Sequence, residues 1–132
     1  MDDESIRKWL YGSSQGECEM KKNKRIYIAT PVNARTEKTL EEKRKAAYYR
    51  CETLKMLLRE EMGDDVRFCT SFDICPLGIT LSEESIMGGC VSLVMKCDAI
   101  YLDHGWTGSK GCNLEYRTAK IYGKEIMEYD KM

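Results

Sequence analysis

The stretch that decides the fold is residues 97–126, CDAIYLDHGWTGSKGCNLEYRTAKIYGKEI. Its apolar run predicts a buried strand at 98–103, and the glycine-rich segment that follows predicts a tight loop. The pattern at 109–122 predicts a helix closed by Gly123, and residues 124–129 predict a last strand. In α/β proteins, ligands bind where such a strand, loop and helix meet, beyond the carboxyl end of the strand.

The rest of the chain repeats this alternation of strand and helix. Residues 25–30 (RIYIAT) are rich in β-branched and aromatic side chains, which predict a buried strand. A long helix is expected at 39–62, with an apolar stripe of Leu40, Ala47, Cys51, Leu54, Leu58 and Met62. A second strand is expected at 65–71. A second helix is expected from Ser82 to about residue 96, with an apolar side of Met87, Cys90, Val91, Val94 and Met95.

The resulting order β-α-β-α-β-α-β predicts an α/β fold, a parallel sheet between two layers of helices. We expect a small doubly wound sheet with strand order 2-1-3-4 and a three-layer αβα architecture. The switch point then lies between the first and third strands, so the loops after Thr30 and Leu102 become neighbours. Residues 1–24 are expected to form an N-terminal extension, and residues 25–132 the one domain.

Composition narrows the classes of function. The chain has 132 residues, of which 42% are hydrophobic and 33% charged, as in ordinary globular domains. A net charge of -1 gives no electrostatic reason to expect nucleic acid as a partner. No apolar run approaches the ~20 residues that cross a bilayer, and the N-terminus does not resemble a secretory signal. We therefore expect a cytoplasmic protein without a membrane partner.

The cysteines do not form a metal-binding pattern. There are seven of them, with no CxxC pair and with His104 as the single histidine. We expect neither a metal nor a cofactor, and reduced thiols that are mostly buried. Cys112 lies in the turn from loop to helix, where the pKa of a thiol is expected to be lowered.

The glycine-rich loop and the helix after it predict an anion site. Gly108 and Gly111 let backbone N–H groups approach a ligand, and the amides that begin the helix favour phosphate. Glu115 follows on the first turns of this helix, about 5–8 Å from the phosphate by helix rise, which is the reach of a pentose. A carboxylate there can attack an electron-poor anomeric carbon. Simple compensation of the helix dipole by Glu115 stays open as the alternative.

The loops on both sides of the switch point supply further candidates. Asp98 and Asp103 are the acids available to protonate a leaving group or to hold a sugar hydroxyl. Trp106 either stacks on a base or covers apolar surface at the rim. The expected binding residues are Thr30, Asn33, Arg35, Asp103, Trp106, Ser109 and Gly111.

Three segments resemble the nucleoside 2-deoxyribosyltransferase family: IYIATP at 26–31, CDAIYL at 97–102 and SKGCNLE at 109–115. The resemblance covers roughly residues 25–127, and it implies a flavodoxin-like fold. It also implies catalytic roles for three residues. Glu115 is then the nucleophile, Asp98 positions or protonates the base, and Tyr27 orients the nucleophile.

Ser109 selects between subgroups of that family. Transferases that act on free nucleosides carry Asp six residues before the nucleophile, whereas 2'-deoxynucleoside 5'-monophosphate N-glycosidases carry a Ser that contacts the phosphate. The resemblance therefore implies an N-glycosidase that hydrolyses a nucleoside 5'-monophosphate. The first loop, ATPVNAR at 29–35, departs from the glycine- and serine-rich loop of those glycosidases, and Arg35 stands in for their arginine.

Other functions stay open. The same pocket can belong to a nucleotide-binding or sensing module without turnover, or to a deoxyribosyl transferase acting on free nucleosides. An FMN protein is disfavoured because the first loop lacks a Ser/Thr-rich phosphate cradle. Members of the family are commonly oligomers, so we expect a homo-oligomer, with Tyr48, Tyr49, Met127 and Tyr129 as candidate contacts.

Overall fold

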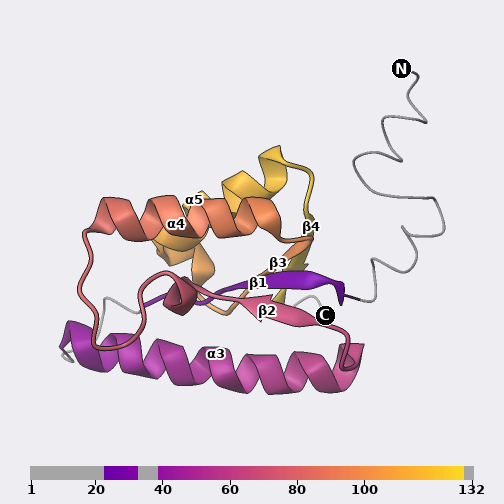
Figure 1. Cartoon of the computed structure of the whole chain (residues 1–132), viewed down its shortest axis with the longest axis horizontal. Coiled ribbons are helices and arrows are strands. Elements are labelled where there is room, and N and C mark those ends of the chain that lie inside the picture. Colours follow the sequence, from indigo (N-terminus) through magenta and orange to yellow (C-terminus); the bar gives the residue numbers. More distant parts are fainter. Residues whose placement is uncertain (1–22, 33–38, 130–132) are drawn as a thin grey trace.

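A four-stranded parallel sheet forms the centre of the protein. The computed structural model describes residues 23–32 and 39–129. The strand order is β2-β1-β3-β4 (Figure 1). The inner strands are β1 (Arg25–Ala29) and β3 (Ala99–Leu102), and the edge strands are β2 (Arg67–Cys69) and β4 (Glu125–Glu128).

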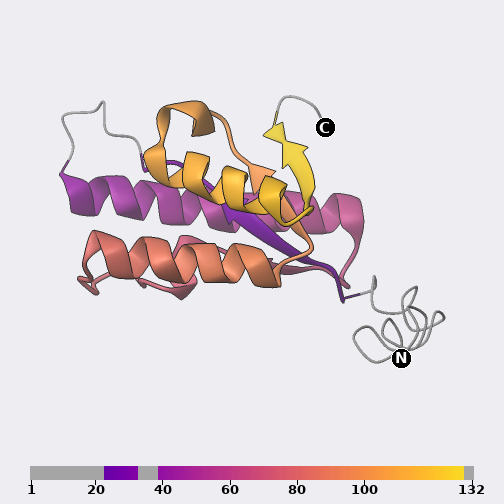
Figure 2. The same ribbon diagram turned by 90° about the horizontal axis from the view of Figure 1, so that it is seen from above.

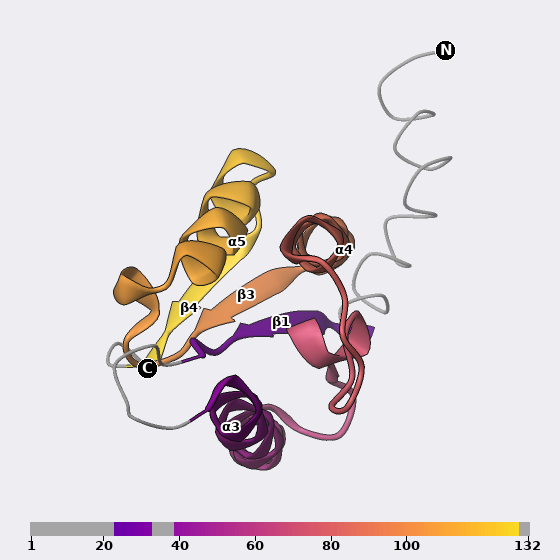
Figure 3. The same ribbon diagram turned by 90° about the vertical axis from the view of Figure 1, so that its left-hand side faces the viewer.

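Three helices cover the two faces of the sheet. The long helix α3 (Leu40–Met62) lies on one face, and Figure 3 shows α4 (Glu83–Lys96) and α5 (Lys110–Ile121) on the other. The view from above shows α4 and α5 side by side (Figure 2). The predicted three-layer fold with strand order 2-1-3-4 is therefore confirmed.

The central strand β1 is buried on both faces, and its alternation decides where each side chain points. Ile26 and Ile28 pack in the core layer beneath α3. Tyr27 and Ala29 pack in the layer that α4 and α5 cover. Because side chains alternate along a strand, the second layer receives Tyr27 from the middle of the sheet.

Local hydrogen bonds shorten the second strand relative to the prediction of 65–71. The backbone N–H of Thr70 donates to the carboxylate of Asp73 (2.8 Å), and the Thr70 hydroxyl accepts from the N–H of Phe72 (3.1 Å). These bonds close a 3₁₀ turn at Ser71–Asp73 in place of further strand. Two residues of the expected apolar stripes, Leu40 and Met95, are exposed, by 68% and 41%.

The expected N-terminal extension, residues 1–24, lies outside the described residues except for its last two. In the ranges 23–32 and 39–129, no helix combines the length and the apolar composition that a membrane crossing needs. The longest, α3, is charged along much of its length, with four residues in its buried stripe: Ala47, Cys51, Leu54 and Leu58.

Alanine is expected to have opposite effects on stability at two adjacent glycines of α4. A Cβ at residue 89 would lie 2.6 Å from Cγ2 of Ile74, whereas a Cβ at residue 88 would meet nothing within 4 Å. Gly89→Ala is expected to lower the free energy of unfolding by about 1–3 kcal/mol because it overpacks the helix against Ile74. Gly88→Ala, the matched control, is expected to raise it by about 0.5–1 kcal/mol through helix propensity.

Urea unfolding of the two variants beside the parent protein measures both changes. A stabilising effect of similar size in both variants would contradict the packing of Ile74 on Gly89.

Candidate functional site

Glu115 is buried in the layer between the sheet and the helices α4 and α5. It is 5% exposed, and its Oε2 accepts a hydrogen bond from the hydroxyl of Tyr27. Tyr27 is on β1 and Glu115 on α5, so the fold brings together two residues that are 88 positions apart. The structure thus unites two of the three residues expected to be catalytic.

Burial controls the protonation of this pair. Removal from water raises the pKa of Glu115 to about 7, because the charged carboxylate loses its solvation. The hydrogen bond from Tyr27 and the nearby thiol of Cys90 act in the opposite direction, since both favour the charged form. The pKa of Tyr27 is raised well above its usual value, by burial first and then by the nearby charge of Glu115. Near neutral pH the tyrosine is therefore a hydrogen-bond donor, and the glutamic acid exchanges its proton.

The dipole interpretation of Glu115 does not fit its position. The first turn of α5 contains no acidic residue, because the helix begins at Lys110 and Glu115 lies more than a turn further along. Compensation of a helix dipole falls off within the first turn and is ordinarily made by an exposed side chain. A buried carboxyl group with a raised pKa is instead typical of functional sites.

The expectation of a lowered pKa for Cys112 is wrong. Burial and the negative charge of Glu115 raise the pKa of this thiol to about 12, against a smaller opposing effect of Ser109. The helix start therefore does not activate the cysteine, because the thiol is buried and lies near a carboxylate.

Ser109 caps the start of α5 and fixes the loop before it. Its hydroxyl accepts from the N–H of Cys112 (3.2 Å), as an N-cap residue does. The side-chain amide of Asn113 donates to the carbonyl groups of Thr107 (3.0 Å) and Ser109 (2.7 Å). These bonds hold the glycine-rich loop against the helix.

A shallow groove of about 360 Å³ runs along the start of α5. Its cationic side chains are Lys110 and Arg117, and Ser109 also lines it. Glu115 is not among the lining residues, since it points to the opposite, buried side of the helix. The groove is thus a positively charged surface beside the predicted phosphate site.

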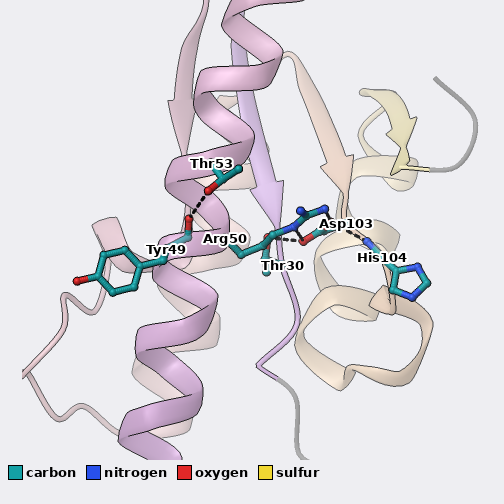
Figure 4. Close-up of polar contacts among 6 residues, drawn as sticks. All are labelled: Thr30, Tyr49, Arg50, Thr53, Asp103 and His104. Carbon is teal, nitrogen blue, oxygen red and sulfur yellow. Dashed lines mark hydrogen bonds and ion pairs between the residues drawn. The ribbon is translucent and has the colours of Figure 1, made fainter.

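Asp103 is held at the carboxyl end of β3 by four hydrogen bonds (Figure 4). Arg50 of α3 donates from Nε (3.0 Å) and from its terminal nitrogen (2.9 Å), one bond to each carboxylate oxygen. Thr30 donates from its hydroxyl (3.3 Å), and the backbone N–H of His104 completes the set (2.8 Å). A buried carboxylate with a bidentate arginine joins α3 to the sheet, which makes Asp103 and Thr30 structural partners here.

The structure does not bring Asp98 to Glu115. Asp98 precedes β3 at the amino edge of the sheet, where its carboxylate accepts from the N–H of Arg25 (2.8 Å). Tyr27 meets Glu115 further along β1, opposite Ile100. The geometry therefore assigns Asp98 to the ladder between β1 and β3.

The remaining expected binding residues differ in how the structure places them. Asn33 and Arg35 lie outside the described residues. Trp106 packs against Tyr116 of α5, with ring centroids 4.8 Å apart, as a residue covering apolar surface does. Gly111 faces α4, where a Cβ would lie 3.3 Å from the sulfur of Met87.

Of the four candidate oligomer contacts, two are exposed and two pack against other residues of the fold. Tyr49 and Tyr129 are exposed. Tyr48 packs edge-to-face against Phe72 (5.4 Å), and Met127 is buried. The homo-oligomer stays a prediction.

Two residues of these sites were not anticipated from the sequence. Cys90 occurs in an apolar stripe at helical spacing, where a thiol and a valine follow the same pattern. Arg50 belongs to a charged helix, and its position three residues after Ala47 and four before Leu54 was the available signal that it borders the core face.

Comparison with known proteins agrees with the fold. Residues 24–128 match the sequence model of a family described as "Domain of unknown function (DUF4406)", and the chain belongs to that family. Among solved structures, the fold is similar to that of the 2-desoxiribosyltransferase from Leishmania mexicana, with a TM-score of 0.54 and 23% identity. The match covers 80% of this chain and 63% of that one, so this chain spans less than two thirds of the transferase. No curated protein matches the sequence.

The raised pKa of Glu115 predicts how stability depends on pH. The folded-state pKa of about 7 exceeds the usual 4.5, so the folded protein binds this proton more tightly than the unfolded chain. The stabilisation is complete below about pH 4.5 and is lost as the pH rises to about 7, a change of about 3 kcal/mol. Glu115→Gln stays neutral, so its free energy of unfolding relative to the parent is expected to rise by that amount from about pH 4.5 to about pH 8.

Urea unfolding at a series of pH values measures this difference. The matched control is Glu60→Gln, which makes the same substitution at an exposed position of α3. A difference for Glu115→Gln that varies with pH no more than the difference for the control would contradict the burial of this carboxyl group.

Proposed function

We propose that this protein is an N-glycosidase that hydrolyses the bond between base and sugar in a nucleoside 5'-monophosphate. The observation that carries the proposal is the buried Tyr27–Glu115 pair, with the Glu115 carboxyl at a pKa of about 7. Similarity of fold to a deoxyribosyltransferase and the resemblance of the SKGCNLE motif support the same class of chemistry.

The reaction balances with Glu115 as the nucleophile and water as the second substrate. The carboxylate forms a bond to the anomeric carbon, and the base leaves with the bonding electron pair and takes a proton from solvent. Water then attacks the same carbon, loses a proton and releases Glu115. Tyr27 orients the carboxylate through its hydrogen bond.

The start of α5 is the proposed phosphate site. The first amides of a helix have no partner within the helix, and their partial positive charge favours an anion. Lys110 and Arg117 add positive charge on the groove beside them. Ser109 accepts a hydrogen bond through its oxygen, so its own O–H stays able to donate to a phosphate oxygen.

The sugar reaches Glu115 between the first turns of α4 and α5. Gly111 has no side chain at this crossing, and it faces the sulfur of Met87. A methionine side chain is flexible and adapts to a ligand at little cost. Gly111 lies about one helical turn before Glu115, so this route leads from the carboxyl edge of the sheet toward the buried carboxylate.

A panel of ribo- and deoxynucleoside 5'-monophosphates tests the activity. We expect release of free base from at least one of them, detected by chromatography. The rate is expected to rise with pH and to level off above about 7, because the attacking form of Glu115 is the carboxylate. Glu115→Gln is expected to lose on the order of 10³-fold in rate.

Absence of base release from every nucleotide, with a folded protein, would contradict the hydrolase. Nucleotide binding that persists in that case, and is kept by Glu115→Gln, would favour the module that senses or sequesters a nucleotide.

Ser109→Asp tests the choice of nucleotide over nucleoside. Aspartate is as good an N-cap as serine, so α5 is expected to stay intact. Its negative charge beside the phosphate is expected to lower kcat/KM for nucleotides by about 10²-fold and to leave free nucleosides less affected. Ser109→Asn, a neutral N-cap, is the control and is expected to retain most of the activity on nucleotides. Equal losses on both substrates would contradict a phosphate at this position.

A further inference from the structure

We propose that Cys90 is a positioning residue of the Glu115 site, holding the carboxylate from α4 while Tyr27 holds it from β1. The inference rests on the proposed function of Glu115 and adds a residue that no family motif singled out. Its basis is that Tyr27 of β1 and Cys90 of α4 pack in one buried core layer, where Glu115 of α5 is also buried and accepts the hydrogen bond of Tyr27.

The geometry of α4 aims Cys90 at this layer. Cys90 is 1% exposed and packs in the same core layer as Tyr27. Met87 of α4 contacts Gly111 of α5, and Cys90 and Glu115 each lie about one turn further along these neighbouring helices, which places the thiol beside the carboxyl group. The pKa values of Cys90 and Glu115 depend on each other, as expected for neighbours. The neighbour one turn along, Val94, packs in the same layer as an ordinary apolar side chain. Of the two buried residues of α4, Cys90 is therefore the one with a polar group to offer the carboxylate.

The thiol acts as a donor. Burial raises the pKa of Cys90 to about 11, so the proton stays on sulfur near neutral pH. A protonated thiol donates to a carboxylate, but more weakly than a hydroxyl does. A weak donor fixes the direction of Glu115 without stabilising its charge enough to return the pKa of the carboxyl group to its usual value. Cysteine at this position therefore orients the nucleophile and keeps it basic.

Substitutions at residue 90 separate this role from simple packing. Serine supplies a stronger donor, and alanine supplies none. We expect the titration midpoint of Glu115 to fall in Cys90→Ser and to rise by about one pH unit in Cys90→Ala. The midpoint is measured by carbon-13 NMR of protein labelled at the glutamate carboxyl carbon, and the resonance is assigned by its loss in Glu115→Gln.

The matched control is Cys97→Ala, which removes another thiol that is 1% exposed in the same core layer. The pKa of Cys97 is raised chiefly by its neighbour Cys69 and by burial, and Glu115 is not among the groups that affect it, so this variant is expected to leave the titration of Glu115 unchanged. Unchanged midpoints in both residue-90 variants would overturn the proposal, and so would an equal shift in Cys97→Ala. If Cys90→Ala does not fold, as judged by circular dichroism, the direction of the serine shift decides alone.

The pH profile of base release is the second readout. Its midpoint is expected to move with the NMR midpoint in each variant, whereas a purely structural role would lower the rate at all pH values alike. Absence of base release by the parent protein would overturn the proposed function, and the NMR titration would still decide whether Cys90 acts on Glu115.

Discussion

The hydrogen bond between Tyr27 and Glu115 is the contact on which the site depends, because it places a carboxyl group inside the apolar core. An ionisable group in such a position is tolerated only with partners, or in its neutral form. The fold supplies the partners by putting Tyr27 on the inner strand β1 and by packing α5 directly over it. The central position of β1 and the direction of its side chains therefore decide that Tyr27 and Glu115 meet in the core.

Two buried carboxyl groups in this protein have different kinds of hydrogen-bond partner. Asp103 lies against Arg50, which donates two hydrogen bonds and balances its charge. Glu115 has neutral donors, and burial raises its pKa to about 7. The first arrangement ties a helix to a strand end. The second leaves a carboxyl group whose proton exchanges near neutral pH, which is what a nucleophile or general base requires. The difference in partners separates an acid whose charge is balanced by arginine from one that exchanges its proton near neutral pH.

Much of the fold was predictable from the sequence. The alternation of apolar runs with helical patterns, punctuated by Pro31 and Gly123, predicted a parallel sheet of order 2-1-3-4, and the structure has it. The second strand was overestimated because the Thr70–Asp73 capping bonds depend on side-chain geometry that periodicity does not report. Apolar periodicity predicts the bounds of a strand or helix well where burial decides them, and poorly where a few polar hydrogen bonds end the element.

The site was predictable only in part. Spacing within one segment pointed to Glu115 and Ser109, because a strand, a loop and a helix start are local features. Cys90 required knowledge of which residue of α4 faces Tyr27, and periodicity treats a thiol like any small apolar side chain. Asp98 and Asp103 were expected to act on the leaving group or the sugar. In the fold, Asp98 instead accepts from the backbone N–H of Arg25, and Asp103 pairs with the side chain of Arg50. Contacts between distant segments decide which acid is available.

The most direct test of the central claim is a crystal structure of Glu115→Gln with a bound nucleoside 5'-monophosphate. The measured quantity is the distance from the anomeric carbon to the side chain of residue 115. Our account predicts about 3–3.5 Å, with the phosphate at the amides that begin α5. A nucleotide bound elsewhere, with its anomeric carbon remote from residue 115, would contradict it.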